Sequence, residues 1–462
     1  MGSIVRTRRD MSARVCTPVP GEVTPRGTVQ GCILPLRPAP ARTRTPPVHF
    51  SALTLARNAL SHHESWPQLW RSPAPRSSYD VIIVGGGGHG LATAYYLAKE
   101  HGICNVAVLE KGWLGGGNTG RNTTVVRSNY FYPQSARFYD FSLRLYEGLS
   151  RELGFNIMLS QRGIINLAHS PHQVELLARW ANALQLNGVD GELLSAAAVR
   201  ERLPLLNAAP GARYPVAGGL LQRRGGIARH DAVAWGYARA ADQRGVDIIQ
   251  ECEVLGFLRE GDRVVGVETS RGCIRAPKVA LAVAGHSSVL AQKAGFRLPV
   301  TSYALQAFVT EPLKPVLDCV VLSLATGTYL SQSDKGELVV GGGLDLYPSY
   351  AQRGNLPTLQ GVIAGLLELF PCFSRLRLLR QWAGVVDVVH DSTPIIDKTP
   401  ARGLYINCGW GTGGFKAIPG GGFVFAHLLA TDRSHPLAEP FSLRRFATGA
   451  LIDEAAAAGI SH

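Results

Sequence analysis

Long apolar runs, paired cysteines and metal-ligand clusters are all missing from this sequence. No segment approaches the roughly 18 consecutive apolar residues of a membrane-spanning helix. Eight cysteines are present, but none form a Cys-x-x-Cys pair, and no histidine–cysteine cluster has the spacing of metal ligands. We therefore expect no membrane span, no metal site and reduced thiols, as in a cytoplasmic protein.

Lysine is absent before Tyr79, and acidic residues are scarce there. Eleven arginines in that segment face three acids, Asp10, Glu22 and Glu64, so it carries +8 of the net charge of +13. The rest of the chain holds only about +5. A basic surface for a nucleic-acid partner is therefore not expected on the folded part. With 462 residues, 46% of them hydrophobic, the chain can bury a large core, and two domains are favoured.

The first 78 residues differ in composition from the rest. Residues 1–47 combine many arginines with eight prolines, which oppose an amphipathic transit helix and predict disorder. We expect this segment to be an extension upstream of a natural start near Val48. Residues 48–78 regain apolar side chains and are interpreted as a docking arm.

The segment from Tyr79 to Glu110 has the pattern of a βαβ nucleotide-binding unit. A strand-like run, 81–84, leads into the turn Gly85-Gly-Gly-Gly-His-Gly90, and a helix-like stretch and a second apolar run follow. Glu110 ends that second run, where a carboxylate can accept hydrogen bonds from a ribose. The alternative is an ordinary strand–turn–helix without a ligand.

Three glycines of this turn each have a physical role that a larger residue could not fill. Gly85 permits a sharp turn out of the strand, Gly87 lets the backbone approach a pyrophosphate, and Gly90 lets the helix lie close to the sheet. The phosphates would bind at the helix N-terminus. Together these features predict an adenine dinucleotide, either NAD or FAD. His89, inside the turn, is a candidate base, but a role beside the phosphates or in a helix cap is favoured.

Two further glycine-rich stretches follow. Residues 111–129 are so rich in glycine that the backbone is expected to lie close to a large, flat ligand, the alternative being a flexible surface loop. Residues 409–422 form a third strand–glycine unit. The helix predicted from Phe423 to Leu429 would direct another dipole at the ligand.

Apolar periodicity predicts the remaining elements. Helices are expected over 133–153 and 170–186, and Asp231 is the expected N-cap of a helix that ends before Gly245. The strand-like runs are 161–168, 246–249, 264–269, 279–286, 303–309, 328–331, 337–341 and 404–408, with a helix over 358–369.

From about Ser78 to the end, the chain resembles the β-subunit family of heterotetrameric sarcosine oxidases, a branch of the D-amino-acid-oxidase-like flavoproteins. The first 47 residues are not covered. The resemblance rests on the motifs at 79–98, Leu109–Trp113, Arg121–Thr124, Ala228–Asp231 and Cys408–Lys416.

The resemblance implies an α/β fold in which a Rossmann-like FAD-binding domain alternates along the chain with an antiparallel-sheet substrate domain. We assign residues 79–160, 223–297 and 381–462 to the FAD-binding domain, and residues 161–222 and 298–380 to the substrate domain.

Two flavins are implied by the resemblance. FAD should be noncovalent, because residues 383–391 lack the cysteine that tethers it in monomeric relatives. FMN should be attached covalently to His230, since a neutral imidazole can attack the C8-methyl carbon of a flavin. The alternative is that His230 is a solvated polar residue. The cofactor-binding residues are expected to be Gly85, Gly87, Gly88, Gly90, Glu110, Lys111, Asn118, Arg121, Asn122, Thr123, Val254, Gly411, Gly413, Gly414 and Lys416.

The implied reaction is the oxidation of sarcosine. Lys416 and Arg127 would bind its carboxylate as catalytic residues while hydride passes to FAD; either could instead be a surface charge. Electrons would continue to FMN and oxygen, giving H2O2, and a methylene unit would reach tetrahydrofolate on a partner subunit. The implied partners are the α, γ and δ subunits of a heterotetramer.

Two other functions stay open. The chain could be a related oxidase or dehydrogenase acting on glycine, dimethylglycine or a cyclic imino acid. It could also be a noncatalytic flavin-binding assembly subunit.

Overall fold

The computed structural model describes residues 52–62, 64 and 68–454. The predicted extension at 1–47 lies outside these residues, as does part of the predicted docking arm at 48–78. The chain divides into two units, residues 1–68 and 69–462. In the first, helix α1 (Ala52–Leu60) exposes the side chains of Leu53, Leu55 and Leu60.

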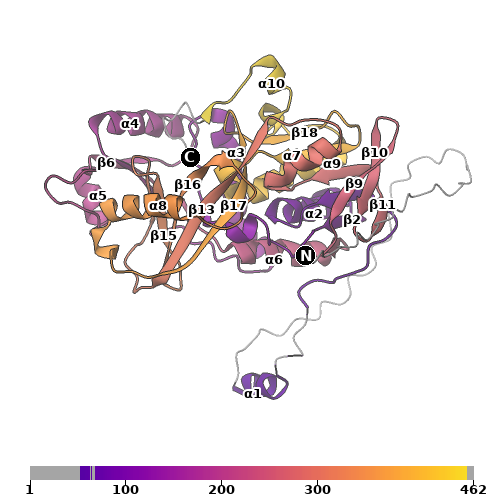
Figure 1. The fold of residues 1–462 in the computed structure, drawn as a ribbon, viewed down its shortest axis with the longest axis horizontal. Coiled ribbons are helices and arrows are strands. Elements are labelled where there is room, and N and C mark those ends of the chain that lie inside the picture. Colours follow the sequence, from indigo (N-terminus) through magenta and orange to yellow (C-terminus); the bar gives the residue numbers. More distant parts are fainter. Residues whose placement is uncertain (1–51, 63, 65–67, 455–462) are drawn as a thin grey trace, which may run out of the picture. The chain divides into compact units, whose positions relative to one another are not determined.

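A six-stranded sheet forms the centre of the part of the second unit that contains the predicted βαβ unit (Figure 1). Neighbouring strands are parallel, except that β18 runs antiparallel to β19. Its strands are short and mostly buried, as expected of a sheet covered on both faces. In spatial order they are β18 (Ile395–Lys398), β19 (Leu404–Cys408), β12 (Lys278–Leu281), β1 (Val81–Val84), β2 (Val106–Leu109) and β8 (Asp247–Ile249).

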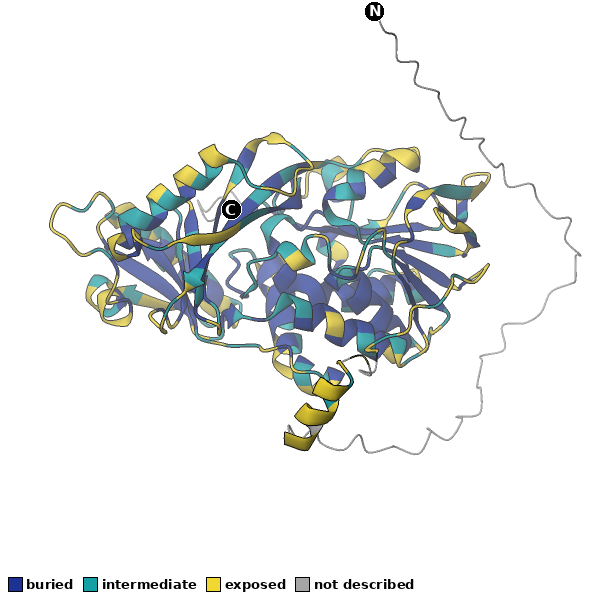
Figure 2. Ribbon diagram, turned by 60° about the horizontal axis from the view of Figure 1, so that its bottom comes forward, coloured by how far each residue is buried: buried dark blue, intermediate teal, exposed yellow. Residues whose placement is uncertain are grey.

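Alternate side chains of these strands enter two different cores. In β1, Val81 and Ile83 pack in one cluster with four helices, while Ile82 and Val84 pack in the other with a small antiparallel sheet. Figure 2 shows the strands and the helices against them mostly buried. The helices are α2 (Gly88–His101), α3 (Pro133–Leu153), α6 (His230–Asp242) and α9 (Ile418–Thr431); the opposite face carries β9 (Val254–Glu260), β10 (Arg263–Thr269), β11 (Gly272–Arg275) and α7 (Ser287–Lys293).

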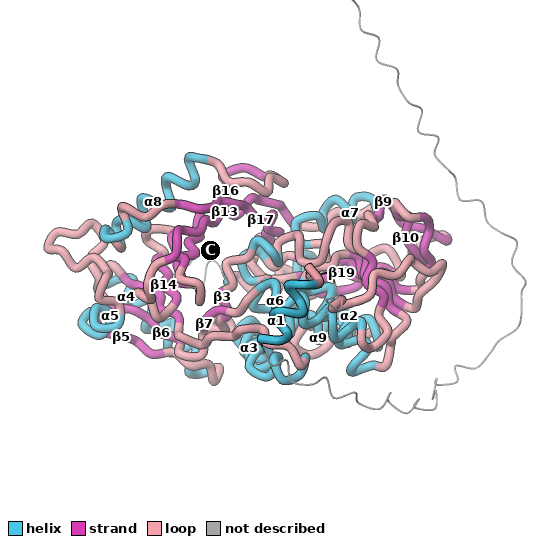
Figure 3. The backbone as a smooth tube through the Cα atoms, turned by 90° about the horizontal axis from the view of Figure 1, so that it is seen from below, coloured by secondary structure: helices cyan, strands magenta, loops and turns pink. Residues whose placement is uncertain are grey.

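An eight-stranded sheet forms the other part of this unit (Figure 3). Neighbours are antiparallel except for β4 and β14, which pair in parallel, so the expected purely antiparallel sheet is mixed. The spatial order is β17 (Leu378–Val389), β13 (Val300–Pro312), β16 (Glu337–Pro348), β15 (Thr328–Gln332), β14 (Val320–Ser323), β4 (Ile164–Ala168), β6 (Gly218–Gln222) and β5 (Glu192–Ser195).

Smaller elements complete the second unit. Helices α5 and α8 contribute to one apolar cluster of the eight-stranded sheet and α4 to another. The domain boundary assigned at residue 381 falls inside β17, whose residues up to Val389 pair with β13. These elements are α4 (Pro171–Leu186), α5 (Ala196–Arg202), α8 (Leu356–Leu369), α10 (Arg445–Thr448) and the two-stranded ribbon of β3 (Val125–Val126) and β7 (Gly226–Ile227).

Two predicted helix starts are wrong. The N-cap of α6 is Arg229, and Asp231 lies inside the first turn, where its Oδ1 accepts from the Ala232 N–H at 2.8 Å. Helix α9 begins at Ile418, five residues before the predicted start at Phe423. A Cβ on the glycines at its start would collide with α2 and α3; at Gly422, for example, it would lie 2.4 Å from the Ala92 Cβ. These glycines therefore permit close helix packing rather than forming a turn.

Among the described residues, no helix combines the length and the apolar character that crossing a membrane requires.

Candidate functional site

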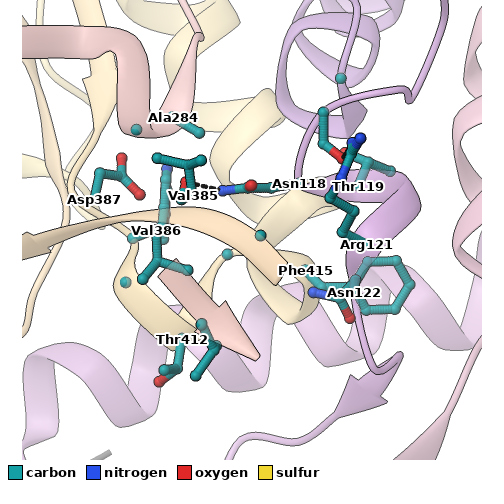
Figure 4. Close-up of a pocket in the computed structure, with 18 of the residues that line it drawn as sticks. Asn118, Thr119, Arg121, Asn122, Ala284, Val385, Val386, Asp387, Thr412 and Phe415 are labelled. Carbon is teal, nitrogen blue, oxygen red and sulfur yellow. Dashed lines mark hydrogen bonds between the residues drawn. The ribbon is translucent and has the colours of Figure 1, made fainter. Parts of the chain in front are cut away.

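A cavity of ≈ 880 Å³ is lined by residues from both large sheets. The loops that follow β1, β2, β12 and β19 line it from the nucleotide side, and strands β13, β14, β15, β16 and β17 contribute from the other side. Figure 4 shows part of its wall, where η1 (Thr119–Arg121) approaches β17. A cavity of this size, enclosed by two sheets, is typical of a cofactor or substrate site.

Most residues predicted to form the site line this cavity. Gly90 and Gly413 do not, and neither does His230. The predicted residues in the lining are Gly85, Gly87, Gly88, Glu110, Lys111, Asn118, Arg121, Asn122, Thr123, Arg127, Val254, Gly411, Gly414 and Lys416.

The first glycine turn brings backbone to the cavity wall. Gly85 has a φ of 110°, and α2 begins directly after Gly87, which has no side chain to cap the helix. A Cβ at Gly90 would lie 2.0 Å from the Gly85 carbonyl oxygen, so Gly90 closes the turn from behind instead of facing a ligand. The start of α2 is thus a helix N-terminus that faces a cavity, an arrangement suited to phosphate.

Glu110 is held in place by its own loop. Its Oε2 accepts from the Gly86 N–H at 2.8 Å and its Oε1 from the Gly112 N–H at 2.9 Å. Each carboxylate oxygen has a second lone pair, so the group can still accept from a ribose hydroxyl. Beside it, Lys111 Nζ lies 3.3 Å from His286 Nε2 at the wall of the same cavity.

Asn118 and Arg121 join the two parts of the site, Asn118 through its side chain and Arg121 through its backbone carbonyl. Asn118 Nδ2 donates to the Val385 carbonyl of β17 (Figure 4). Arg121 Nη1 donates to the carbonyls of Gly116 and Gly117, and the Arg121 carbonyl accepts from Trp382 Nε1 at 2.8 Å. These two predicted cofactor residues therefore fix the wall of the cavity in this structure.

Two buried side chains, Arg127 and Lys416, line the cavity, and neither forms an ion pair in the described part of the chain, although the charge of Arg127 acts to lower the pKa of the buried Glu454. Arg127 Nη1 donates to Asn129 Oδ1 at 2.8 Å, and Lys416 Nζ donates to the Thr412 carbonyl at 2.9 Å. The Arg127 guanidinium also lies 4.6 Å above the Tyr130 ring. Burial, followed by the charge of Arg127, holds the pKa of Lys416 well below its usual range. This end of the cavity therefore favours an anion.

The loop that carries Lys416 is held by side chains from α3. Ser142 Oγ donates to the Lys416 carbonyl at 2.7 Å, and the Tyr146 hydroxyl donates to the Phe415 carbonyl at 2.7 Å. These hydrogen bonds hold the backbone of the loop in place and leave the Lys416 side chain free to line the cavity.

His89 serves the same loop. Its Nε2 lies 2.9 Å from the Gly414 carbonyl oxygen, and its ring stacks on Trp410 at 4.7 Å. Burial lowers the pKa of His89 to about 4, so the imidazole is neutral at physiological pH. Its contacts give it a packing role between the glycine turn at Gly85–Gly90 and the glycine turn at Gly409–Gly411.

Asp387 was missed by the sequence reasoning. It lies near the end of β17, is buried and lines the cavity. The only local signal for a functional role of Asp387 is that it is a single acid in the apolar run Val385-Val-Asp-Val-Val389. An aspartate is rarely buried in a strand unless its carboxylate has a partner.

His230 lies outside the cavity lining, at the first position of α6. Its side chain is 26% exposed. Nδ1 accepts from the Asp231 N–H at 2.8 Å, which leaves Nε2 as the ring nitrogen without a partner in the described part of the chain.

Sequence comparison decides the family. The profile of a family described as FAD dependent oxidoreductase (DAO) matches residues 80–428. The chain belongs to this family. It is 55% identical to sarcosine oxidase subunit beta of Rhodobacter capsulatus, over 89% of this chain and 99% of that protein. The protein of the same name from Rhizobium meliloti is 58% identical, over 88% of this chain and 98% of its own length. The resemblance drawn from the motifs is confirmed, as is the dependence on FAD.

Solved structures agree on the fold. L-proline dehydrogenase from P. horikoshii matches with a TM-score of 0.76 at 27% identity, over 82% of this chain and 100% of that chain. Glycine oxidase from Geobacillus kaustophilus matches with a TM-score of 0.72 at 23% identity, over 80% and 99% of the two chains. The predicted Rossmann-like α/β fold with a second, sheet-based part is confirmed.

Proposed function

We propose that this chain is the catalytic β subunit of a cytoplasmic, heteromeric sarcosine oxidase. The observation that carries the proposal is the pair of buried cations, Arg127 and Lys416, in a cavity that a glycine turn and Glu110 also line. Relatives that are more than half identical to the chain are sarcosine oxidase beta subunits.

The two cations anchor the carboxylate of the substrate. Two positive groups hold one end of a small zwitterion and restrict its rotation, so that the C–H bonds beside nitrogen meet the cofactor in few orientations. The same charges lower the pKa of the substrate ammonium and so favour the neutral amine, the form that can release hydride. Asn129 and Tyr130 orient Arg127, and Thr412 orients Lys416.

The residues of the cavity fit FAD. Gly87 and Gly88 bring backbone to the cavity at the start of α2, where the Gly88 N–H donates to Thr119 Oγ1 at 3.0 Å, and Glu110 offers a carboxylate directly after β2, as an adenine dinucleotide requires. When bound, FAD supplies the hydride acceptor. Lys111, Asn122, Thr123, Val254, Gly411 and Gly414 line the same cavity and would contact it. No described residue in 383–391 is a cysteine, in keeping with noncovalent binding.

His230 is the proposed attachment point of FMN. Its free Nε2 would form a bond to the C8-methyl carbon, while the Nε2 proton and one methyl proton leave and two electrons remain on the flavin for oxygen to remove. Because the side chain is partly exposed and lies outside the cavity, the rest of that flavin would be held by a partner subunit.

Replacing His230 with alanine tests this attachment. We expect His230→Ala to retain dissociable FAD but to lose the flavin fluorescence that stays with this chain after acid precipitation. His427→Ala, a change at another half-buried histidine, should keep that fluorescence. Covalent flavin in the His230→Ala chain would contradict the assignment.

The wider assembly is also a proposal. The chain would associate with α, γ and δ subunits, and electrons from sarcosine would pass through FMN to oxygen, giving H2O2. Glycine is the product, and a partner subunit transfers the methylene unit to tetrahydrofolate. The name "subunit beta" of the relatives supports an assembly of several chains.

A different amine substrate is the rival function. It is favoured by the match to L-proline dehydrogenase and by a 27% identical glycine oxidase of Pseudomonas putida that aligns with 79% of this chain. The purified complex should be assayed with sarcosine, dimethylglycine, glycine and L-proline. We expect kcat/KM to be highest for sarcosine; a higher value for another substrate would overturn the assignment, and no turnover with any of them would favour an assembly role.

A further inference from the structure

Asp387 lines the cavity and also contacts the second glycine turn, Gly409–Gly411. The Asp387 side chain is buried, and its Oδ2 accepts from the Gly409 N–H at 2.5 Å. Burial raises the pKa of Asp387 to about 6, while the backbone N–H groups of Gly409, Trp410 and Gly411 act in the opposite direction. The Asp387 carboxylate is therefore mainly charged at neutral pH, and the Gly409 N–H donates to it.

The backbone of this turn has the shape of an anion-binding nest. Trp410 is right-handed, with φ −73° and ψ −18°, and Gly411 is left-handed, with a φ of 50°. A right-handed residue followed by a left-handed one points successive N–H groups at a single anion. In a nucleotide-binding protein such a nest could hold a ligand phosphate, but here the Asp387 carboxylate lies beside it and accepts a hydrogen bond from the N–H of Gly409, the preceding residue.

The nest is linked directly to Lys416. Gly411 precedes Thr412, and the Thr412 carbonyl accepts the hydrogen bond from Lys416 Nζ at 2.9 Å. Rotation of the peptide units around Gly411 would move that carbonyl and with it the ammonium group. Glycine restricts such rotation only weakly, so a hydrogen bond from the turn to Asp387 would help to hold the backbone in one conformation.

We propose that Asp387 is a positioning residue, which accepts a hydrogen bond from the second glycine turn and thereby fixes the Thr412 carbonyl that orients Lys416. This inference rests on the proposed role of Lys416 in binding the substrate carboxylate. Asp387 acts on Lys416 through the backbone of the turn and not by contact with its side chain.

Restoring a carboxylate from solution tests the inference in the intact complex. In Asp387→Ala we expect KM for sarcosine to rise about tenfold while kcat changes by less than about threefold. Added formate, a carboxylate small enough for the vacated space, should lower that KM again. In the wild-type complex formate should only compete weakly with sarcosine.

Asp397→Ala is the matched control. Asp397 also caps backbone, accepting from the Leu443 N–H at 2.8 Å, but it does not line the cavity. Its KM should equal that of the wild type with and without formate. An unchanged KM in Asp387→Ala, or a raised KM that formate leaves unaltered, would overturn the proposal.

Two further measurements keep the test decisive. If Asp387→Ala does not assemble, Asp387→Asn, which keeps one acceptor oxygen, should raise KM by a smaller factor; a wild-type KM there would also count against the proposal. Butyrate, in which a methylene replaces the amine of sarcosine, reports carboxylate binding through the flavin absorbance. If the wild type does not turn over sarcosine, the proposed function fails, but weaker butyrate binding in the Asp387 variants would still support the positioning role.

Discussion

The two glycine turns at the cavity share a composition but meet different groups. At Gly85–Gly90 the backbone leads into the N-terminus of α2, where the Gly88 N–H donates to Thr119 Oγ1 at 3.0 Å, and Glu110 holds the turn from the side. At Gly409–Gly411 the Gly409 N–H donates to Asp387, and α3 holds the loop that follows through hydrogen bonds to its carbonyls. We propose that the first turn receives a ligand and that the second positions Lys416. Glycine-rich sequence alone therefore does not identify a phosphate site.

The largest expected effect comes from a methyl group at the first turn. In Gly90→Ala the new Cβ would lie 2.0 Å from the Gly85 carbonyl oxygen, a backbone atom that cannot move away cheaply. We expect a loss of at least about 3 kcal/mol of unfolding free energy and no retained FAD. Thermal unfolding and the flavin content of the purified protein measure both effects.

Gly148→Ala is the matched change for that experiment. Gly148 lies within α3, and a Cβ there would have no neighbour within 4 Å. Its stability should stay the same or rise slightly, because alanine favours a helix. Equal stability of the Gly90→Ala protein and the Gly148→Ala protein would show that the first turn does not need its glycine.

The next largest effect is the pH dependence of butyrate binding, which depends on Lys416 beyond the second turn. Because burial and Arg127 lower the pKa of Lys416, its ammonium is charged only below that lowered value. A bound carboxylate restores the proton, so the affinity for butyrate should be constant at lower pH and fall as pH rises through the pKa of free Lys416, by up to about tenfold per pH unit. Flavin absorbance titrations at several pH values measure it.

Lys416→Arg provides the comparison for the pH series. Arginine keeps its charge throughout the accessible range, so this step in the affinity profile should disappear. A wild-type profile in the arginine variant would assign the titration to another group.

The smallest expected effect is on FAD binding alone, and it tests whether the first turn acts only on the cofactor. In Glu110→Gln one of the two acceptors for the Gly86 and Gly112 N–H groups is lost, along with a charged partner for the ribose. We expect FAD to bind about tenfold more weakly, while KM for sarcosine at saturating FAD stays unchanged. A changed KM for sarcosine would mean that the two turns do not act independently.

The first turn could be predicted from the sequence because its parts are close together in the chain. Strand, glycines, helix and Glu110 form one continuous unit, and each residue type has a local reason. The second turn could be located but not interpreted, because the groups that meet it, Asp387, Ser142 and Tyr146, lie on distant elements. Nothing near Gly409 in the sequence indicates that its donors are already satisfied.

Pairing between distant strands limited the fold prediction in a similar way. The nucleotide sheet followed from buried apolar runs, but the parallel pairing of β4 with β14 joins strands about 150 residues apart and has no local signal. The predicted start of α9 was wrong because its glycines are required by close contact with Ser142, His89 and Ala92, which lie on other helices.

The central claim is that Lys416, presented by the second turn, binds the substrate while the first turn holds FAD. Anaerobic mixing of sarcosine with wild-type complex and with Lys416→Met, at equal FAD content, tests it most directly. We predict bleaching of the wild-type FAD band and at least about a hundredfold lower second-order rate of bleaching in the variant. Bleaching of Lys416→Met at the wild-type rate and with the wild-type saturation constant would contradict the account.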